Sequence, residues 1–281
     1  MKFEKWQALG NDYVILEEEG LLWELNQQRI QRICDPHFGV GSDGVLLISK
    51  TDDPAYVATL RIFNPDGSEA ELSGNGAREA ILYLRRHGWT EDEEFSILTE
   101  SGPVTPRITS DRTCSVEMGT ASVTSKDFPS GDESGKGTVT SAGRDWNFQH
   151  VSIGNPQCAI EVGSEIEDLD LPKIGPDIEN SGLFPNRTNV SFFRVSGSRV
   201  RARIFERGVG ETLSSGTGAS GAAVAAYLNG APSPITVELD GGELLVEITP
   251  DLEVTLTGWA EPILAGELAP ELVESMAELT A

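Results

Sequence analysis

The feature of this sequence that most limits its fold is an internal repeat. The tripeptide Arg-Ile-Phe occurs at residues 61–63 and again at 203–205, 142 residues later. Each copy ends ten residues before a Ser-Gly-X-Gly-Ala segment, at 73–77 in the first half and at 215–219 in the second. One matching tripeptide would mean little, but here two motifs recur in the same order at the same offset.

A further pair of segments recurs at an offset of 144, with Gly10-Asn11-Asp12 in the first half and Gly154-Asn155-Pro156 in the second. Together the pairs indicate duplication of a domain of about 130 residues. We therefore expect an α+β fold of two pseudo-symmetric lobes, each a mainly antiparallel sheet wrapped around a central helix. The expected N-terminal lobe is 1–117 plus 265–281 and the C-terminal lobe is 118–264, with the active site in the cleft between them.

Segments that alternate or are rich in β-branched residues predict strands. They cover residues 56–63, 115–118, 200–205, 235–239, 243–248 and 252–256. One helix is predicted in each lobe, at 77–87 and 219–229, and the glycine after each, Gly88 or Gly230, fits a C-terminal cap. The Ser-, Gly- and Thr-rich segment 122–143 is expected to be a loop or an irregular hairpin near the lobe boundary.

The composition argues against several classes of function. A net charge of −24, from 45 acidic and 21 basic residues, opposes binding to nucleic acid or to an anionic membrane surface. The three cysteines lack Cys-x-x-Cys spacing and fit a reduced compartment, and no run reaches the roughly 18 apolar residues of a membrane span. We therefore expect an untargeted cytoplasmic protein. The three histidines are scattered, so no metal site is expected.

The two Ser-Gly-X-Gly segments are candidate anion sites. Each lies directly before a predicted helix, where free backbone N–H groups point outward. If the lobes face each other, the two helix starts could hold one carboxylate and present Ser73 and Ser215 to opposite faces of one carbon, which suits stereochemical inversion. For either segment alone, helix capping and tight turns are the simpler explanation. The duplication and the polar flanks at 64–69 and 206–212 favour substrate binding.

Over essentially its whole length, the sequence resembles the cofactor-independent diaminopimelate epimerases. The runs 64–69 and 73–78 are similar to the first signature of that family, and 206–212 and 215–218 to its second. In both signatures the family carries cysteine where this chain has serine, at Ser73 and Ser215. The likeness extends to Leu9-Gly10-Asn11-Asp12, Gly154-Asn155-Pro156, Arg187-Thr188-Asn189-Val190 and Thr257-Gly258.

The resemblance implies interconversion of LL- and meso-diaminopimelate in lysine biosynthesis, without pyridoxal phosphate or metal, by a homodimer. In the family one thiolate removes the α-proton and the other thiol returns a proton from the opposite face. The residues that the resemblance assigns to substrate binding carry amide, charged or backbone groups that suit a zwitterion. They are Asn11, Asn64, Asn155, Asn189, Glu206 and Arg207 through their side chains, and Gly74, Asn75, Gly216 and Thr217 through the backbone.

Serine at both catalytic positions departs from the family pattern. An alcohol is a far weaker acid than a thiol and needs a neighbouring base. No histidine lies in these motifs, and Gln157 stands where members of the family commonly have one. Glu206 is the carboxylate that we nominate for this task. Gly44 is a further departure, because some members place a glutamine contact there.

Several explanations stay open. The cysteines could have been changed deliberately, the serine form could be natural and perform epimerisation or another α-proton reaction, or the chain could be an amino-acid-binding homologue without catalysis. A proline racemase or hydroxyproline dehydratase activity on the related fold is a further alternative, against which the block Glu206-Arg207-Gly208 favours diaminopimelate. Exchange of the α-proton distinguishes a catalyst from a binding protein.

Overall fold

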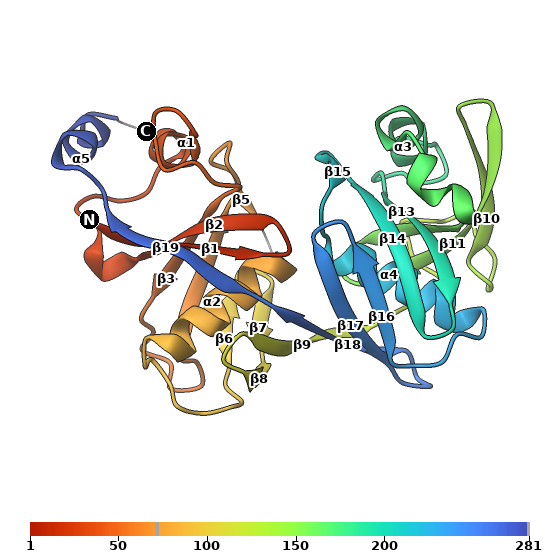
Figure 1. Cartoon of the computed structure of the whole chain (residues 1–281), viewed down its shortest axis with the longest axis horizontal. Coiled ribbons are helices and arrows are strands. Elements are labelled where there is room, and N and C mark those ends of the chain that lie inside the picture. The colour runs from red at the N-terminus through yellow and green to blue at the C-terminus, as the bar shows by residue number, and fades with distance from the viewer. Residues whose placement is uncertain (71–72, 280–281) are drawn as a thin grey trace. The chain divides into compact units, whose positions relative to one another are not determined.

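The computed structural model describes residues 1–70 and 73–279, and these form two compact units (Figure 1). Unit 1 comprises Met1–Val116 and Gly258–Ala281, and unit 2 comprises Glu117–Thr257. Within the described part of the chain, no helix is both long and apolar enough to cross a membrane.

The first sheet has eight strands among the described residues, and its order is β19-β1-β2-β3-β4-β6-β7, with β5 paired to β4. The bounds of its strands are β1 Lys2–Ala8, β2 Asn11–Glu17, β3 Val45–Ser49, β4 Ala58–Phe63, β5 Glu69–Ala70, β6 Ile97–Thr99, β7 Gly102–Val104 and β19 Glu261–Glu267. Four segments of unit 1 are helical in the described ranges, namely η1 Glu18–Gly20, α1 Gln27–Cys34, α2 Gly74–Arg86 and α5 Pro270–Ala277.

The second sheet has eleven strands within the same described ranges, in the order β10-β11-β12-β13-β14-β16-β17-β18-β9-β8, with β15 paired to β14. Its strands are β8 Pro106–Ser110, β9 Thr113–Thr120, β10 Lys136–Ser141, β11 Arg144–Ser152, β12 Pro156–Glu161, β13 Asn189–Ser196, β14 Arg199–Glu206, β15 Gly210–Thr212, β16 Ile235–Leu239, β17 Gly242–Ile248 and β18 Glu253–Trp259. The helical segments of unit 2 are η2 Ser164–Asp168, α3 Leu171–Glu179 and α4 Gly216–Leu228.

The two sheets share one topology, which confirms the predicted pseudo-symmetry. In the path β1-β2-β3-β4-β6-β7 the successive pairings are antiparallel, parallel, antiparallel, parallel and antiparallel. The path β11-β12-β13-β14-β16-β17 repeats this sequence of pairings. The repeated Arg-Ile-Phe tripeptides lie at the ends of β4 and β14, so the motifs that recur in sequence occupy equivalent places in each sheet.

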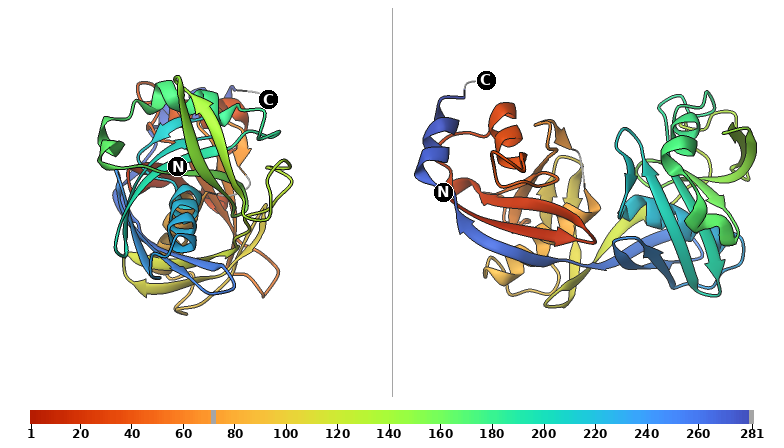
Figure 2. Two further views of the ribbon diagram at one scale, coloured as in Figure 1. Left: turned by 90° about the vertical axis from the view of Figure 1, so that its right-hand side faces the viewer. Right: turned by 45° about the horizontal axis from the view of Figure 1, so that its top comes forward.

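A helix lies inside each sheet, as the sequence predicted. Helix α4 packs against six strands, β11 to β14, β16 and β17, and its alanine- and glycine-rich residues are buried on all sides (Figure 2). Helix α2 packs against β1 to β4 and is buried over most of its length. Small side chains allow the strands to approach α4 closely, because a Cβ on Gly218 or Gly221 would lie within 3 Å of a neighbouring side chain.

Both central helices begin three residues earlier than predicted, at Gly74 and Gly216. The reason is capping, since the side chains of Ser73 and Ser215 accept backbone N–H groups and so start the helix at the preceding motif. The predicted C-terminal caps are confirmed, because Gly88 has a φ of +69° and Gly230 a φ of +99°.

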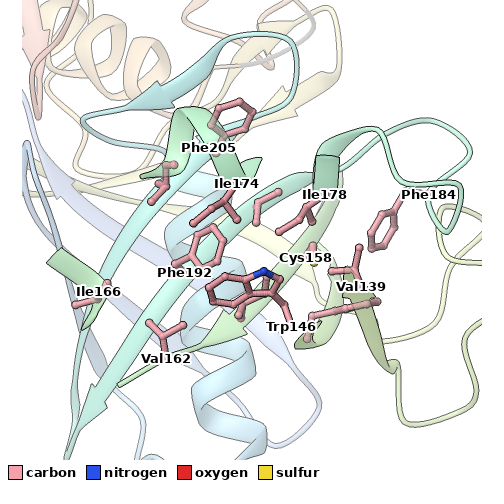
Figure 3. Packing of buried hydrophobic residues seen from close by; sticks show 14 of the residues in the cluster. Val139, Trp146, Cys158, Val162, Ile166, Ile174, Ile178, Phe184, Phe192 and Phe205 are labelled. Carbon is pink, nitrogen blue, oxygen red and sulfur yellow. The ribbon is translucent and has the colours of Figure 1, made fainter. Parts of the chain in front are cut away.

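A second core lies on the other face of each sheet. In unit 2 the indole of Trp146 packs edge-on against Phe192, with ring centroids 5.3 Å apart, beneath Ile174 and Ile178 of α3 (Figure 3). In unit 1, α1 packs with α5, which spans Pro270–Ala277, over the apolar residues of β2 and β3. Each sheet is therefore covered on both faces, by a central helix on one face and by a second apolar core on the other.

Segment 122–143, which was predicted to be a loop or an irregular hairpin, ends in one arm of a regular hairpin. Strand β10 occupies Lys136–Ser141 and pairs in regular register with β11. Val139 of this strand is buried against the aromatic core of unit 2, which offsets the weak strand propensity of its glycine and serine residues.

Candidate active site

The first half-site is the start of α2 in unit 1. The Oγ of Ser73 accepts the N–H of Gly76 at 3.1 Å and thereby caps the helix. The same oxygen accepts a second hydrogen bond, 3.2 Å long, from the hydroxyl of Tyr13 on β2. Tyr13 is 6% exposed. The Ser73 hydroxyl is therefore held between a helix start and a buried phenol.

A hydrogen-bond network that runs from buried Arg78 to exposed Asp43 orients the amides beside Ser73. Asn75 donates its Nδ2 to Asn11 Oδ1 at 3.3 Å, and Asn11 donates its own Nδ2 to Asp43 at 3.0 Å. Arg78 is fully buried and donates to Asn75 Oδ1 at 2.5 Å and to the Gly74 carbonyl at 2.9 Å. The structure thus brings together Asn11 and Asn75, two of the candidate substrate contacts.

Asn64, at the end of β4, is engaged in a turn. Its Nδ2 donates to Ser68 Oγ at 3.0 Å, and its backbone N–H donates to the Ser68 carbonyl at 2.8 Å. These bonds are those of an asparagine that closes a tight turn. A substrate contact by Asn64 remains a prediction.

The second half-site is the start of α4 in unit 2. Ser215 caps the helix by accepting the Gly218 N–H at 3.2 Å, and it donates its own proton to Glu206 Oε2 at 2.9 Å. Thr212 donates to the other oxygen of this carboxylate at 2.8 Å. Burial raises the pKa of Glu206 above its ordinary value of 4.5, and the hydrogen bonds from Thr212 and Ser215 partly oppose this shift. Glu206 is therefore a strengthened base in direct contact with a hydroxyl.

Asn155 and Thr217 also meet in the second half-site. Asn155 donates its Nδ2 to Thr217 Oγ1 at 3.3 Å. Gln157, which stands where the resemblance expected histidine, donates to Asn155 Oδ1 at 2.6 Å. Gln157 is fully buried, and in the described ranges its Oε1 has no hydrogen-bond partner. The glutamine therefore orients Asn155.

Asn189 orients the backbone at Arg207. Its Oδ1 accepts the Arg207 N–H at 2.9 Å, while its Nδ2 donates to the Pro156 carbonyl at 3.1 Å. The half-buried guanidinium of Arg207 donates to the Asn186 carbonyl at 3.1 Å. These bonds fix the direction of the strand end that carries both Glu206 and Arg207.

The four candidate backbone contacts lie in the first turns of the two central helices. They are Gly74 and Asn75 in α2, and Gly216 and Thr217 in α4. First-turn N–H groups have no partner inside the helix and carry the positive end of its dipole. Such groups bind carboxylates.

Four further residues of these half-sites were not identified from the sequence, namely Tyr13, Arg78, Glu79 and Thr212. Glu79 is fully buried next to Arg78 in the chain, and burial raises its pKa well above 4.5. The available signal was position, because each residue directly adjoins, or lies within, a segment already singled out. Their contacts depend on strand register and helix phase, which the sequence pattern alone did not reveal.

The chemistry open to this arrangement is proton transfer at a carbon atom next to a carboxylate. Each half-site joins a hydroxyl to a second acid-base group, the phenol of Tyr13 or the carboxylate of Glu206. Within the described residues, no cluster of three His, Cys, Asp or Glu side chains could hold a metal ion.

Comparison with known proteins decides the family. Residues 3–124 and 149–262 match the family model described as diaminopimelate epimerase. The chain belongs to the diaminopimelate epimerase family. It is 40% identical to diaminopimelate epimerase 2 of Nostoc sp. (strain PCC 7120), over 97% of each chain. It is 36% identical to the diaminopimelate epimerase of Synechococcus sp. (strain JA-3-3Ab), over 96% of this chain and 98% of the relative.

Solved structures share the fold of this diaminopimelate epimerase family member. A probable proline racemase from Agrobacterium radiobacter K84 matches with a TM-score of 0.67 and 13% identity, over 97% of this chain and 95% of the other. A phenazine biosynthesis protein of the PhzF family from Bacillus anthracis matches with a TM-score of 0.66 and 18% identity, over 96% and 99%. At these identities the likeness establishes the α+β fold and not the substrate.

Proposed function

We propose that this chain is a cofactor-independent epimerase that interconverts LL- and meso-diaminopimelate by two-base α-proton transfer. Family membership supports the reaction class. One observation supports activity of the form with serine at both positions. The Ser215 hydroxyl donates to the half-buried carboxylate of Glu206 at 2.9 Å, which is the contact that an alcohol needs to take part in proton transfer.

In this proposal the second half-site removes the α-proton of one diastereomer. The Cα–H bond breaks, the proton moves to Ser215 Oγ, and the Ser215 proton moves to Glu206. The electron pair left on Cα spreads into the neighbouring carboxylate. First-turn N–H groups stabilise the negative charge that develops there. Ser73 returns a proton to the opposite face of the same carbon.

The proposed substrate contacts follow the charges of a zwitterion. The reacting carboxylate binds the backbone at Gly74, Asn75, Gly216 and Thr217. The side chains of Asn11, Asn64, Asn155, Asn189, Glu206 and Arg207 hold the ammonium groups and the distal carboxylate. The hydrogen bonds that orient Asn11, Asn155 and Asn189 support this assignment, because an oriented amide binds with less loss of side-chain entropy.

We further propose that the reaction serves lysine biosynthesis in the cytoplasm and that the protein is a homodimer. Strand β19 supports the dimer, because it ends the first sheet and exposes Ile263 and Leu264 by 51% and 44%. An apolar strand at a sheet edge readily pairs with a second copy. Ile263→Lys is expected to shift the mass measured by light scattering toward the monomer, with Leu22→Lys as the surface control.

The proposed reaction is tested by proton NMR of LL-diaminopimelate in deuterated water. Loss of the α-proton signal, with appearance of the meso isomer on chiral chromatography, is the expected result. The variant Ser73→Cys/Ser215→Cys is assayed beside the protein, and calorimetry measures binding by both forms.

The outcomes separate the alternatives. Binding without exchange by the serine form, with exchange restored by the two cysteines, would identify an amino-acid-binding homologue that has lost catalysis. Absence of binding by both forms would refute diaminopimelate as substrate. Exchange with proline or hydroxyproline in its place would favour a racemase of the proline type.

A further inference from the structure

The two half-sites draw their acid-base groups from different strands. Glu206, which contacts Ser215, follows Asn64 by 142 residues, so the equivalent position in unit 1 carries an amide that cannot accept a proton as a base. Conversely, Gln157 follows Tyr13 by 144 residues and bonds to Asn155, whereas Tyr13 reaches Ser73. The phenol of Tyr13 therefore occupies in the first half-site the role of partner that a carboxylate has in the second.

Gly44 makes the room for this contact. A Cβ at residue 44 would lie 2.6 Å from Cε1 of the Tyr13 ring and 2.3 Å from the carbonyl oxygen of Phe63. The ring of Tyr13 thus fills the space where a side chain at residue 44 would begin. The other side of the ring is close to α2, because a Cβ on Gly76 would lie 3.4 Å from Tyr13 Cε2. Packing on both sides holds the hydroxyl toward Ser73.

Charged groups lie on the elements that carry this pair and on the elements next to them. Arg78 and Glu79 lie on α2, Asp12 lies on β2, and Asp43 lies just before β3. Lys5 on β1 forms a salt bridge of 2.9 Å with Asp12. The pH dependence of the reaction therefore has to be compared between variants in which these groups are unchanged.

We propose that Tyr13 is the proton-relay partner of Ser73 and acts on the reaction through the Ser73 hydroxyl. The inference rests on the proposed α-proton chemistry and specifies how its second half is carried out. An aliphatic alcohol that protonates a carbanion alone would be left as an alkoxide. A phenol, with a pKa of about 10, gives up its proton far more easily.

The proposed transfer moves one proton at each face of the carbon. When Ser215 and Glu206 remove the α-proton, the new C–H bond forms with the Ser73 proton, and the Tyr13 O–H bond breaks as its proton moves to Ser73 Oγ. The electron pair of that bond stays on Tyr13 as phenolate, while Glu206 has become the neutral acid. After product release, Glu206 loses its proton to solvent and Tyr13 regains one. In the reverse reaction the phenolate accepts a proton through Ser73.

The test measures inversion and exchange separately for LL- and meso-diaminopimelate in deuterated water. Tyr13→Phe removes only the hydroxyl. It is expected to lower the rate of inversion by at least about tenfold, within the range of general acid-base catalysis. Exchange with retention at the face of Ser215 should continue for one of the two diastereomers, because Glu206 and Ser215 remain intact.

Tyr83→Phe is the matched control. Tyr83 lies on α2 in the same unit, is 7% exposed, and donates its hydroxyl to Glu17 at 2.8 Å. The Tyr83→Phe variant loses the same hydroxyl from a buried tyrosine and should leave the rate of inversion unchanged. Incorporation of fluorotyrosine at residue 13 gives a second readout, since the more acidic phenol should move the basic limb of the inversion profile to lower pH.

The possible results are distinct. The relay would be overturned if folded Tyr13→Phe inverted diaminopimelate at a rate within twofold of that of the unaltered protein. It would also be overturned if Tyr13→Phe slowed inversion and exchange equally and fluorotyrosine did not shift the pH profile. If the unaltered protein exchanges no α-proton, the proposed epimerase function fails and the relay fails with it. Normal inversion by both the unaltered protein and Tyr13→Phe would leave the epimerase function intact and refute the relay alone.

Discussion

In unit 2 the hydroxyl of Ser215 donates to a carboxylate, whereas in unit 1 the hydroxyl of Ser73 accepts from a phenol. Both serines cap a central helix in the same way and follow strands of the same topology. The backbone that presents the hydroxyl is therefore the same in both units, while the hydrogen-bond partner of the hydroxyl differs. If both serines transfer protons as proposed, the two half-sites are unequal acids and bases on equivalent scaffolds.

Replacing the carboxylate of Glu206, which distinguishes the second half-site from the first, should have the largest effect on activity. Glu206→Gln keeps a hydrogen-bond acceptor for Ser215 but cannot take up a proton. We expect α-proton exchange to fall by about 10²- to 10⁴-fold. Binding measured by calorimetry should fall much less, and Glu211→Gln on the neighbouring strand is the control for loss of one charge. Exchange within a few-fold of normal would show that Glu206 is not the base.

The pH profile of the unaltered protein tests the same residue. Glu206 must be ionised to accept a proton, and burial raises its pKa above 4.5. The rate kcat/KM should therefore fall as pH decreases, with its midpoint above 4.5. Thr212→Val removes a hydrogen bond that stabilises the ionised form, so it should move this midpoint to higher pH.

The second largest effect is expected from Arg78, where the two units differ in how they hold the first turn of the helix. Arg78 donates to the Gly74 carbonyl at 2.9 Å, and Ser220, 142 residues later, donates to the Gly216 carbonyl at the same distance. Arg78→Met removes the hydrogen bond to the Gly74 carbonyl and also the buried hydrogen bond that Arg78 donates to Asn75. It should lower the free energy of unfolding by about 3 kcal/mol.

Ser220→Ala is the matched variant in unit 2. It removes one neutral hydrogen bond and should cost about 1 kcal/mol. Denaturant unfolding followed by circular dichroism measures both. Equal costs for the two variants would show that the buried guanidinium contributes no more than a hydroxyl.

Glu79→Gln tests a smaller difference between the two central helices, namely a pH-dependent contribution to stability. Residue 79 of α2 is a buried acid, while its counterpart in α4 is Gly221. Because the folded pKa of Glu79 is raised above 4.5, the unfolded chain releases this proton first as pH rises. The stability that Glu79 contributes is fully present below 4.5 and is lost as pH rises toward the folded pKa.

Glutamine does not titrate, so the variant and the unaltered protein should match in unfolding free energy near pH 4. Glu79→Gln should then become increasingly the more stable of the two at higher pH. Urea unfolding at a series of pH values measures this, with Glu94→Gln at the surface as the control. A variant less stable than the unaltered protein at neutral pH would indicate that Glu79 is ionised and paired with Arg78.

The sequence predicted the shared architecture because repeats, glycine caps and strand alternation are local signals. Ser73, Ser215 and Glu206 lie inside recognisable motifs, and their part in catalysis stays a prediction. The sequence did not predict the contact between Tyr13 and Ser73, which depends on the missing side chain of Gly44 and on the packing of β2 against α2. It also missed β10, whose strand is stabilised by the burial of Val139 in a core assembled from distant segments.

The smallest expected effect on stability concerns two arginines at equivalent positions of β4 and β14. Arg61 pairs with Glu69 and its side chain is 47% exposed, whereas Arg203 pairs with Glu211 and is 14% exposed. Arg203 also donates to the carbonyls of Ile166 and Leu169 at 2.9 Å.

Arg203→Met should therefore lower the free energy of unfolding by about 2 kcal/mol, since two carbonyl oxygens lose their donor. Arg61→Met removes an exposed ion pair and should cost less than about 1 kcal/mol. Raising the salt concentration should reduce the cost of Arg61→Met more than that of Arg203→Met, because exposed charges are screened most. If both variants lost the same stability at every salt concentration, the contacts to Ile166 and Leu169 would contribute nothing measurable, and the two strand ends would be energetically as well as topologically equivalent.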